Sequence, residues 1–315
     1  MKILICGYIG GGNCGDEAIC DRLTAYLKQA GDEVTLLSLN PTESALLHHT
    51  PTLPRYSPKL IAALRGSDLL ILGGGTLLQE QTSKRSPWYY LGIGALAATL
   101  GTPWVLMGGI DPLSGGNRWL AERILPTARV GLMRSAADLH RLAALAPNLP
   151  RFYLPDCALL PMENNASPSK SPLHYIVFCP KKGVPRSALS PLVAKHRHRG
   201  RRIVWLAMSK EDEEVCAKWS DTFGGVWVAA MPTAYRHHRR VEACTILPDL
   251  YRGGPHRYFA AQSCEIACRL IEGADCVYSA RLHGLIFAKK AGTPARILPD
   301  GTKQWKFQGL LREAF

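Results

Sequence analysis

Short apolar runs alternate with amphipathic stretches along the chain. In the first half, the runs have the length and composition of buried strands; they span 2–6, 34–39, 69–74, 104–109 and 130–133. Segments with helical spacing lie between or after them, at 16–30, 58–66, 88–100, 117–125 and 136–146. This alternation predicts an α/β fold, in which helices cover both faces of a parallel sheet.

The polar, proline-flanked stretch 163–172 has the composition of a linker. The alternation then resumes, with apolar runs at 175–179, 203–208, 226–230, 276–280 and 295–299. We therefore predict two domains, 1–162 and 173–315, that face a central cleft. Ligands bind at the carboxyl ends of strands in open α/β sheets, so we expect the loops at these ends to line the cleft.

The uncharged segment Tyr89–Ile110 is as long as a membrane-spanning helix. Gly101, Thr102 and Pro103 divide it into a helix-sized and a strand-sized part, so we expect a buried helix followed by a central strand. No secretory signal is recognisable, and the ten cysteines include no CxxC pair. Both features are typical of a cytoplasmic protein with reduced cysteines.

The composition, with 47% hydrophobic and 20% charged residues, is that of a globular protein. Its net charge of +13 favours anionic partners. The basic clusters 195–202 and 236–240 lack the interleaved aromatic residues that stack on bases, so we expect no nucleic acid partner. We interpret them first as solvated faces, and second as surfaces for anionic polymer or lipid at the inner membrane face. We expect no metal and no cofactor.

The segment Tyr278–Gly292 carries Arg281 and His283 where an apolar run becomes a helix. Unpaired N–H groups and the positive end of the helix dipole favour an anion at a helix N-terminus. A fixed cation and a titratable imidazole there predict a site that binds phosphate or carboxylate beside a proton donor. The alternative is a histidine that only caps the helix or packs in the core.

Two glycine-rich segments also follow apolar runs. Gly7–Ala18 contains the pattern GxGxxG, but no acidic residue follows about 20 residues later, which argues against a nicotinamide cofactor. Its polar residues Asn13, Asp16 and Glu17 suit hydroxyl recognition, although Asp16 could simply cap the helix. Gly73–Tyr90 joins three glycines to polar residues that suit the same role or a solvated connection; they include Gln79, Thr82, Ser83 and Arg85.

Two further cations are candidates for the predicted cleft. Arg134 ends the run 130–133, and Lys303 follows the last predicted strand. Either residue could instead lie on the surface.

Together these segments resemble the polysaccharide pyruvyl transferase family, especially its CsaB branch. The resemblance covers nearly the whole chain and rests on GYIGGGNCGDEA, LLILGGGTLLQEQTSKRSPWYYLGIGALA, Arg134 and SARLHGLIFAKKAGTP. It implies two Rossmann-like domains in a GT-B-like fold. It also implies transfer of an enolpyruvyl-derived group from phosphoenolpyruvate to a sugar, giving a pyruvate ketal and phosphate. In the CsaB branch, the sugar is N-acetylmannosamine of a lipid-linked cell-wall polymer precursor, and the ketal anchors surface-layer proteins.

The resemblance also implies residue roles. His283 falls on the catalytic histidine, and Arg134, Arg281, Leu282 and Lys303 are expected to bind phosphoenolpyruvate. The residues suited to hydroxyl recognition are then expected to bind the acceptor; they are Asn13, Asp16, Glu17, Gln79, Thr82, Ser83 and Arg85. The chain departs from its relatives at Ser135, Ala136 and Asp111, which affects the identity of the acceptor more than the reaction.

The chemistry agrees with these residue types. Phosphoenolpyruvate carries a carboxylate and a phosphate, which need several cations, and a histidine is suited to protonating its methylene carbon. Two other functions stay open. One is a nucleotide-sugar glycosyltransferase of the same architecture, in which Arg281 and Lys303 would hold a diphosphate. The other is a non-catalytic protein that binds a sugar or an anionic polymer.

Overall fold

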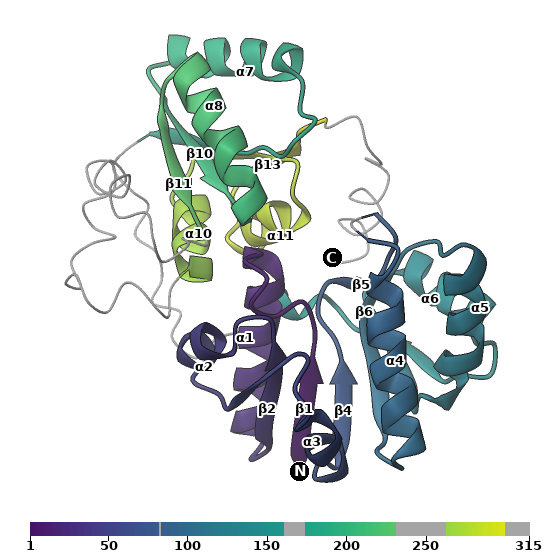
Figure 1. The fold of residues 1–315 in the computed structure, drawn as a ribbon. Coiled ribbons are helices and arrows are strands. Elements are labelled where there is room, and N and C mark those ends of the chain that lie inside the picture. Colours follow the sequence, from purple (N-terminus) through teal and green to yellow (C-terminus); the bar gives the residue numbers. More distant parts are fainter. Residues whose placement is uncertain (82, 161–173, 231–262, 300–315) are drawn as a thin grey trace. The chain divides into compact units, whose positions relative to one another are not determined.

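The computed structural model describes residues 1–81, 83–160, 174–230 and 263–299 (Figure 1). The chain divides into two units. The first contains Met1–Gly11 and Asp16–Leu160, and the second joins Gly12–Gly15 to the described residues from 174 onward. The predicted linker, 163–172, lies outside the described residues.

The first unit is built on a parallel sheet. Within the described residues its strands follow the order β3-β2-β1-β4-β6-β7-β8, with β5 beside β6. The strands are β1 (Lys2–Cys6), β2 (Glu33–Ser38), β3 (Thr52–Pro54), β4 (Leu69–Leu72), β5 (Thr76–Leu78), β6 (Trp104–Ile110), β7 (Val130–Met133) and β8 (Arg151–Tyr153). All of their pairings are parallel. The order β3-β2-β1-β4 is that of a Rossmann fold, whose switch point lies between β1 and β4.

The helices of this unit connect consecutive strands, as the alternation predicts. They are α1 (Cys14–Gln29), α2 (Pro41–His48), α3 (Leu60–Arg65), α4 (Ser86–Thr99), α5 (Gly115–Ile124) and α6 (Ala136–Leu145), with 3₁₀ turns η1 (Leu125–Thr127) and η2 (Cys157–Leu159). Side chains from the strands and from α3, α4, α5 and α6 form an apolar core cluster, in which Trp104 and Tyr90 are almost fully buried.

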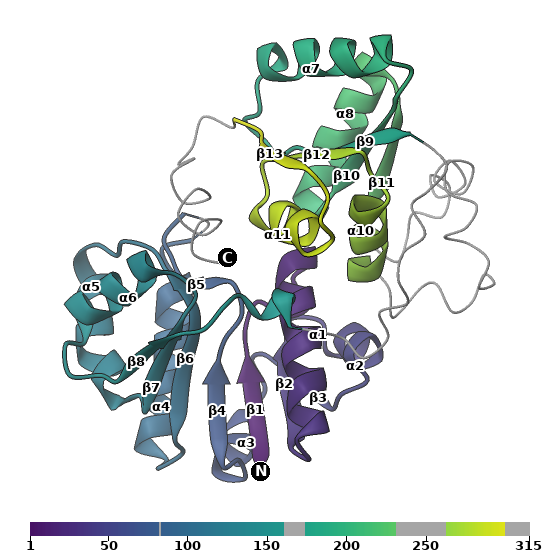
Figure 2. The ribbon, with the colours of Figure 1, turned by 180° about the vertical axis from the view of Figure 1, so that it is seen from behind.

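The second unit repeats the Rossmann pattern around its own core. Its described strands follow the order β11-β10-β9-β12-β13, and all pairings are parallel (Figure 2). They are β9 (Tyr175–Cys179), β10 (Arg202–Ala207), β11 (Val226–Ala229), β12 (Cys276–Ser279) and β13 (Ala295–Ile297). The helices are α7 (Arg186–His198), α8 (Glu213–Phe223), α10 (Ser263–Glu272) and α11 (Leu282–Lys290), with the 3₁₀ turn η3 (Lys210–Asp212). Both units are therefore Rossmann-like, as predicted, while the cleft between the domains stays a prediction.

The uncharged segment Tyr89–Ile110 folds as the glycine and proline residues within it predict. Helix α4 ends at Thr99, and β6 begins at Trp104. Every residue of β6 is buried, because the strand lies inside the sheet between β4 and β7. In the described parts of the chain, no helix has the length and apolar character needed to cross a membrane.

Candidate active site

The N-terminus of α11 lies at the carboxyl end of β12, where the strand order of the second sheet reverses between β9 and β12. The Ser279 hydroxyl accepts a hydrogen bond from the Arg281 N–H (3.0 Å) and donates to the Arg281 carbonyl (2.7 Å). This turn ends the strand and makes Arg281 the last residue before the helix. Leu282 and His283 are the first two helical residues, and both are partly buried. The imidazole therefore belongs to the turn whose N–H groups lack intrahelical acceptors.

An ion pair with Asp212 holds the Arg281 side chain. Nε and Nη2 of Arg281 donate to the two oxygens of this carboxylate, the first at 2.9 Å, and Nη2 also donates to the Ser209 hydroxyl at 3.0 Å. Asp212 is almost fully buried, so the fork geometry is fixed and most of the guanidinium charge is compensated. Among the described residues, these bonds engage Nε and Nη2, which leaves the two donors of Nη1 for a ligand.

The segment Gly12–Gly15 lies along residues 208–210 in the same unit. The Cys14 N–H donates to the Met208 carbonyl (2.9 Å), and the Lys210 N–H donates to the Gly12 carbonyl (3.2 Å). Between these bonds, Asn13 forms a β-bridge with Ser209, the residue that also contacts Arg281. The first glycine-rich motif and the Arg-Leu-His motif are thus joined through Ser209.

His283 lies directly against Gly15. A β-carbon built on Gly15 would overlap the Nδ1 side of the His283 ring, so any other residue at position 15 would displace the imidazole. The Asn13 side chain accepts a hydrogen bond from the Gly15 N–H (2.9 Å) and fixes this turn. The sequence pattern identifies Gly15 only as part of GxGxxG, whereas its contact explains why this position excludes a side chain.

Arg134 follows β7 at the carboxyl edge of the first sheet, as predicted. Its Nη1 pairs with Asp156 (2.8 Å), and its Nη2 donates to the Thr76 hydroxyl (2.7 Å). The guanidinium lies over Gly109, where a β-carbon would come within 3.2 Å of Nε. Nε is buried and has no acceptor within the part of the chain that the structure describes. A buried donor of this kind calls for a partner, which an anionic ligand can supply.

Asp16 and Glu17 are consecutive, but the structure gives them different surroundings. Asp16 accepts a hydrogen bond from the Gly75 N–H at 3.1 Å and so connects α1 to the second glycine-rich loop. Glu17 is almost fully buried, where its carboxylate accepts from the Gly10 N–H (2.8 Å) and pairs with His48 (2.9 Å). The acceptor role assigned to Glu17 stays a prediction, but its contacts are those of a structural ion pair. Asp16 is the better placed of the two acids for a ligand.

The polar residues after the second glycine-rich loop are partly used in local turns. Gln79 accepts from the Gln81 N–H (2.7 Å), and the Ser83 hydroxyl accepts from the Arg85 N–H (3.1 Å). Ser83 and Arg85 are exposed, so their side chains face solvent. Asp111, where the chain departs from the relatives it resembles, accepts from the Gln81 side chain at 2.6 Å. The predicted site residues Thr82 and Lys303 lie outside the described residues.

Arg55 is a buried cation that the sequence pattern does not single out. It follows β3, and its guanidinium lies 3.8 Å from the ring centroid of Tyr89 and 4.9 Å from that of Tyr90. Only 9% of Arg55 is exposed, and its Nε has no acceptor among the described residues. An arginine enclosed by tyrosines at the ligand-binding edge of a Rossmann sheet is a further candidate for binding a polar or anionic group. The signal is weak in the sequence because β3 is only three residues long.

The buried pair of His48 and Glu17 makes a testable contribution to stability. Burial lowers the pKa of His48, but the nearby Asp21, Cys20 and Glu17, the last of which is hydrogen-bonded to it, outweigh burial and raise the pKa to about 12. The folded chain thus keeps a proton that the unfolded chain releases above a pH of about 6.5. The stabilisation is complete below that pH and declines as the pH rises towards the folded pKa.

His48→Gln is therefore expected to lower the free energy of unfolding by about 3 kcal/mol near pH ~6, since it breaks a buried ion pair. The difference from the wild type should be smaller near pH ~9. Urea unfolding at the two pH values measures it, and His140→Gln, at an exposed position of α6, is the control. A difference that grows with pH would contradict the assignment.

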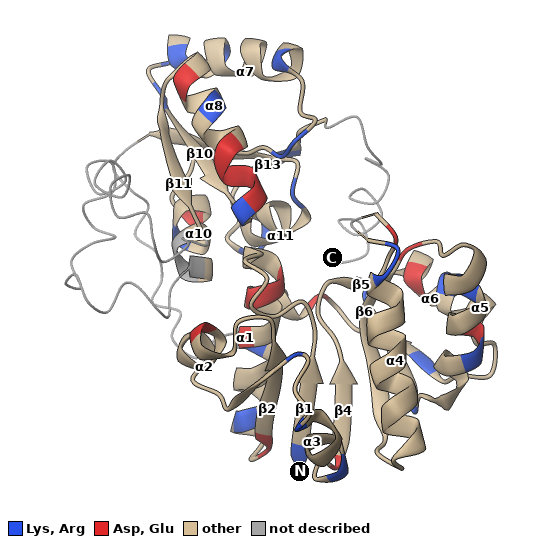
Figure 3. Ribbon diagram, in the orientation of Figure 1, with Lys and Arg blue, Asp and Glu red and all other residues tan. Residues whose placement is uncertain are grey.

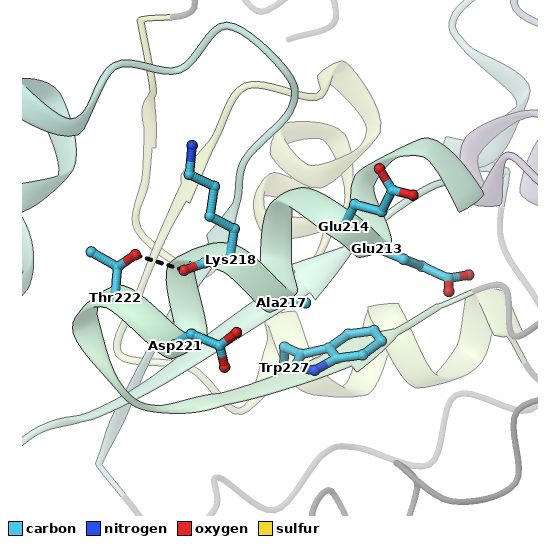
Figure 4. Close-up of a pocket in the computed structure, with 7 residues that line it drawn as sticks. All are labelled: Glu213, Glu214, Ala217, Lys218, Asp221, Thr222 and Trp227. Atoms are coloured by element: carbon cyan, nitrogen blue, oxygen red, sulfur yellow. Dashed lines mark hydrogen bonds between the residues drawn. The ribbon is translucent and has the colours of Figure 1, made fainter.

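The surface of α8 carries a pocket of about 680 Å³ (Figure 4). Its wall consists of Glu213, Glu214, Ala217, Lys218, Asp221, Thr222 and Trp227. The Thr222 hydroxyl donates to the Lys218 carbonyl at 2.8 Å, which is an ordinary helical contact. Three carboxylates make this pocket unsuited to an anionic substrate, and none of the described site residues lines it. Within the described residues, no group of His, Cys, Asp or Glu side chains is arranged to hold a metal ion.

Comparison with known proteins gives a family match and a fold match. Residues 13–213 match the family model for polysaccharide pyruvyl transferases, and no curated protein matches the chain. The matched segment includes Asn13, Asp16, Arg134 and Asp212, whereas Arg281 and His283 follow it.

Several solved structures resemble the whole chain at low identity. The UDP-GlcNAc 2-epimerase from Methanocaldococcus jannaschii is 11% identical, with a TM-score of 0.56 over 99% of this chain and 91% of that chain. A putative UDP-N-acetylglucosamine 2-epimerase from Listeria monocytogenes is 12% identical, with a TM-score of 0.55 over 100% and 87%. The spinosyn rhamnosyltransferase SpnG is 15% identical, with a TM-score of 0.51 over 99% and 84%. These likenesses show the fold class, that of GT-B enzymes with two Rossmann-like domains.

Proposed function

Because this chain belongs to the polysaccharide pyruvyl transferase family, we propose that it converts phosphoenolpyruvate and a sugar diol into a pyruvate ketal and phosphate. The observation that carries the proposal is the joined arrangement in the second unit. Arg281, Ser209, Asn13 and Gly15 are linked by contacts that end at the His283 ring. A cation, a helix N-terminus and an imidazole in one unit suit a donor that carries two anionic groups.

The donor needs cations that stay in place during the reaction. In the proposal, the Nη1 donors of Arg281 and the first N–H groups of α11 hold one anionic group of phosphoenolpyruvate. The ion pair with Asp212 keeps the guanidinium oriented and limits the cost of burying its charge. Arg134 is proposed as a further cation for the donor, because its buried Nε has no acceptor among the described residues. Charge-assisted hydrogen bonds of this kind contribute about 1.5 to 3 kcal/mol each.

Ketal formation then requires one proton at carbon and two new bonds to oxygen. His283 gives a proton to the methylene carbon of phosphoenolpyruvate, and positive charge develops at C2. One sugar hydroxyl attacks C2 and loses its proton to a base. The second hydroxyl attacks the same carbon as the C2–O bond to phosphate breaks, and its proton leaves with phosphate or to solvent. A positioned general acid typically accelerates such a step by ~10² to 10⁴.

The second part of the proposal is the identity of the acceptor sugar. We propose N-acetylmannosamine of a lipid-linked cell-wall polymer precursor, as in the CsaB branch that the motifs resemble. Asp16 is the acid proposed to orient or deprotonate the sugar hydroxyl, because Glu17 is occupied by His48 and Gly10. The exposed side chains of Ser83 and Arg85 supply further polar contacts for a sugar.

The proposal is tested by incubating the protein with phosphoenolpyruvate and a panel of acceptor glycosides that includes N-acetylmannosaminides. We expect phosphate release that requires both substrates, and a product whose mass corresponds to a pyruvate ketal. Nucleotide sugars serve as the comparison, because the structural relatives include glycosyltransferases. Release of a nucleoside diphosphate from a nucleotide sugar, with no reaction of phosphoenolpyruvate, would instead establish the glycosyltransferase alternative.

A further inference from the structure

Two tryptophans of the first unit are unusually exposed. Trp88 in the first turn of α4 is 53% accessible, and Trp119 in α5 is 52% accessible. Tryptophan side chains are highly buried on average, and indoles left in water on neighbouring elements are typical of a surface that contacts something else. Helices α4 and α5 pack against each other (Figure 1), so the two side chains belong to one part of the molecule.

Contacts along α5 bring the two indoles onto one strip of surface. A ring carbon of Trp88 lies 3.6 Å from the position of a β-carbon on Gly116. Trp119 and Arg123 follow Gly116 by three and seven residues, which places all three on one side of the helix. The Arg123 guanidinium lies 4.2 Å from the Trp119 ring centroid. The strip therefore runs from Trp88 across Gly116 to Trp119 and Arg123.

Basic residues occur on the elements that carry this strip. Figure 3 shows Lys and Arg positions in blue on α5 and near the start of α4. Lys84 and Arg85 precede α4, and both are exposed, as is Arg123 in the strip itself. The Asn117 side chain donates to the Lys84 carbonyl (3.1 Å), which attaches the start of α5 to the Lys84–Arg85 segment. The Lys84–Arg85 segment is thus attached beside the start of α5, and Arg123 lies in the last turn of the same helix.

The acidic side chains nearby already have partners. Glu80 accepts hydrogen bonds from the Ser114 N–H, the Ser114 hydroxyl and Asn117, and these bonds lower its pKa. Glu122 pairs with Arg118 at 2.7 Å, and Asp111 accepts from Gln81. Glu122 offsets Arg118, and Glu80, which its lowered pKa keeps ionised, offsets one further cation, so Lys84, Arg85 and Arg123 still leave a positive excess on this face.

We propose that this aromatic-basic face, formed by Lys84, Arg85, Trp88, Trp119 and Arg123, docks the protein on a bilayer of anionic phospholipids. Indole rings prefer the headgroup region, where their apolar bodies and polar N–H groups are both satisfied. The arginines and the lysine attract the lipid phosphates. The docking surface does not depend on which reaction the protein catalyses.

The basic cluster 195–202 in the second unit is a weaker candidate for this role. His196 bonds to the Tyr278 hydroxyl (3.0 Å), and Arg201 pairs with Asp275 (3.0 Å), so two of its members serve the fold. Among the described residues, the large exposed hydrophobic side chains all belong to the first unit. The cluster can attract anions, but it lacks side chains that would enter the headgroup region.

Sedimentation of the full chain with lipid vesicles measures binding and tests this proposal. One set contains phosphatidylcholine alone, and the other contains equal parts of phosphatidylcholine and phosphatidylglycerol. We expect the wild type to bind only the anionic vesicles, and added salt to weaken binding. Trp88→Ser/Trp119→Ser should reduce partitioning about tenfold or more. Phe152→Ser/Tyr153→Ser is the matched control, because it removes two exposed aromatic side chains from the edge strand β8.

Three results would overturn the proposal. The first is a wild type that ignores anionic vesicles, and the second is a tryptophan variant that binds them as well as the wild type does. The third is a tryptophan-dependent dimer in light scattering without vesicle binding, which would mean that a second copy covers this face. Thermal unfolding of each variant confirms that a loss of binding does not come from a loss of folding, and pyruvyl transfer is not part of the readout.

Discussion

Replacing His283 with alanine is expected to slow phosphate release from phosphoenolpyruvate by ~10² to 10⁴, while phosphoenolpyruvate still binds. The imidazole is proposed to give the proton that starts the reaction, so its loss acts on the chemical step. Arg281 and its ion pair with Asp212 remain, and they supply the binding contacts. Phosphate release at saturating substrates gives the rate, and calorimetry gives the affinity for phosphoenolpyruvate.

A second histidine variant separates the loss of the general acid from a general effect of removing a histidine. His198 is exposed in the last turn of α7, and His198→Ala should retain the wild-type rate. If His283→Ala released phosphate at the normal rate, His283 would not be the general acid. If the variant lost affinity for phosphoenolpyruvate in proportion to its rate, the histidine would act in binding. Melting temperatures of both variants show whether either change affects folding.

Most of the fold follows from the apolar runs, because the long strands are buried on both faces. The run 104–109 predicts β6, all of whose residues are buried, and the run 175–179 predicts β9. The strands β3, β5 and β8 have three residues each and are not predicted. Segments this short carry no periodicity of their own, and they become strands because a neighbouring strand offers hydrogen bonds. Strand β13 is equally short but begins the apolar run 295–299, which is why it is predicted.

The site is predicted where its residues are local in sequence. Ser279, Arg281 and His283 lie within one strand-to-helix turn, so the sequence correctly places the arginine and the histidine at a helix N-terminus. Asp212 is 69 residues away from Arg281 in the chain, and no local pattern marks it as the partner. Partners that only the fold brings together are the part that sequence reasoning misses.

The acids at the start of α1 show the same limit on a smaller scale. Consecutive helical residues point about 100° apart, so at most one of Asp16 and Glu17 can face the second glycine-rich loop. The sequence assigns both to the acceptor. In the structure, Asp16 accepts a hydrogen bond from Gly75, whereas Glu17 is buried against His48. The sequence misses this ion pair because His48 ends α2, a helix that the apolar pattern does not predict.

A methyl group at Gly15 should impair catalysis nearly as much as loss of the histidine. In Gly15→Ala, the new β-carbon would overlap the imidazole of His283, so the ring must leave its position. A displacement of about 1 Å in a catalytic group can cost ~10² in rate. We therefore expect phosphate release to fall by at least roughly that factor, while Arg281 and Asp212 keep their contacts and phosphoenolpyruvate still binds.

Two further variants identify the cause of the rate loss in Gly15→Ala. One replaces a matched glycine, and the other combines Gly15→Ala with His283→Ala. Gly92 lies inside α4 with no atom near its β-carbon position, so Gly92→Ala should be fully active and slightly more stable. If Gly15 acts only by leaving room for the His283 ring, Gly15→Ala/His283→Ala should be no slower than His283→Ala alone, because the two changes affect one group. If the double variant were slower than His283→Ala by the full factor that Gly15→Ala costs alone, Gly15 would have a separate role, such as holding the loop against residues 208–210.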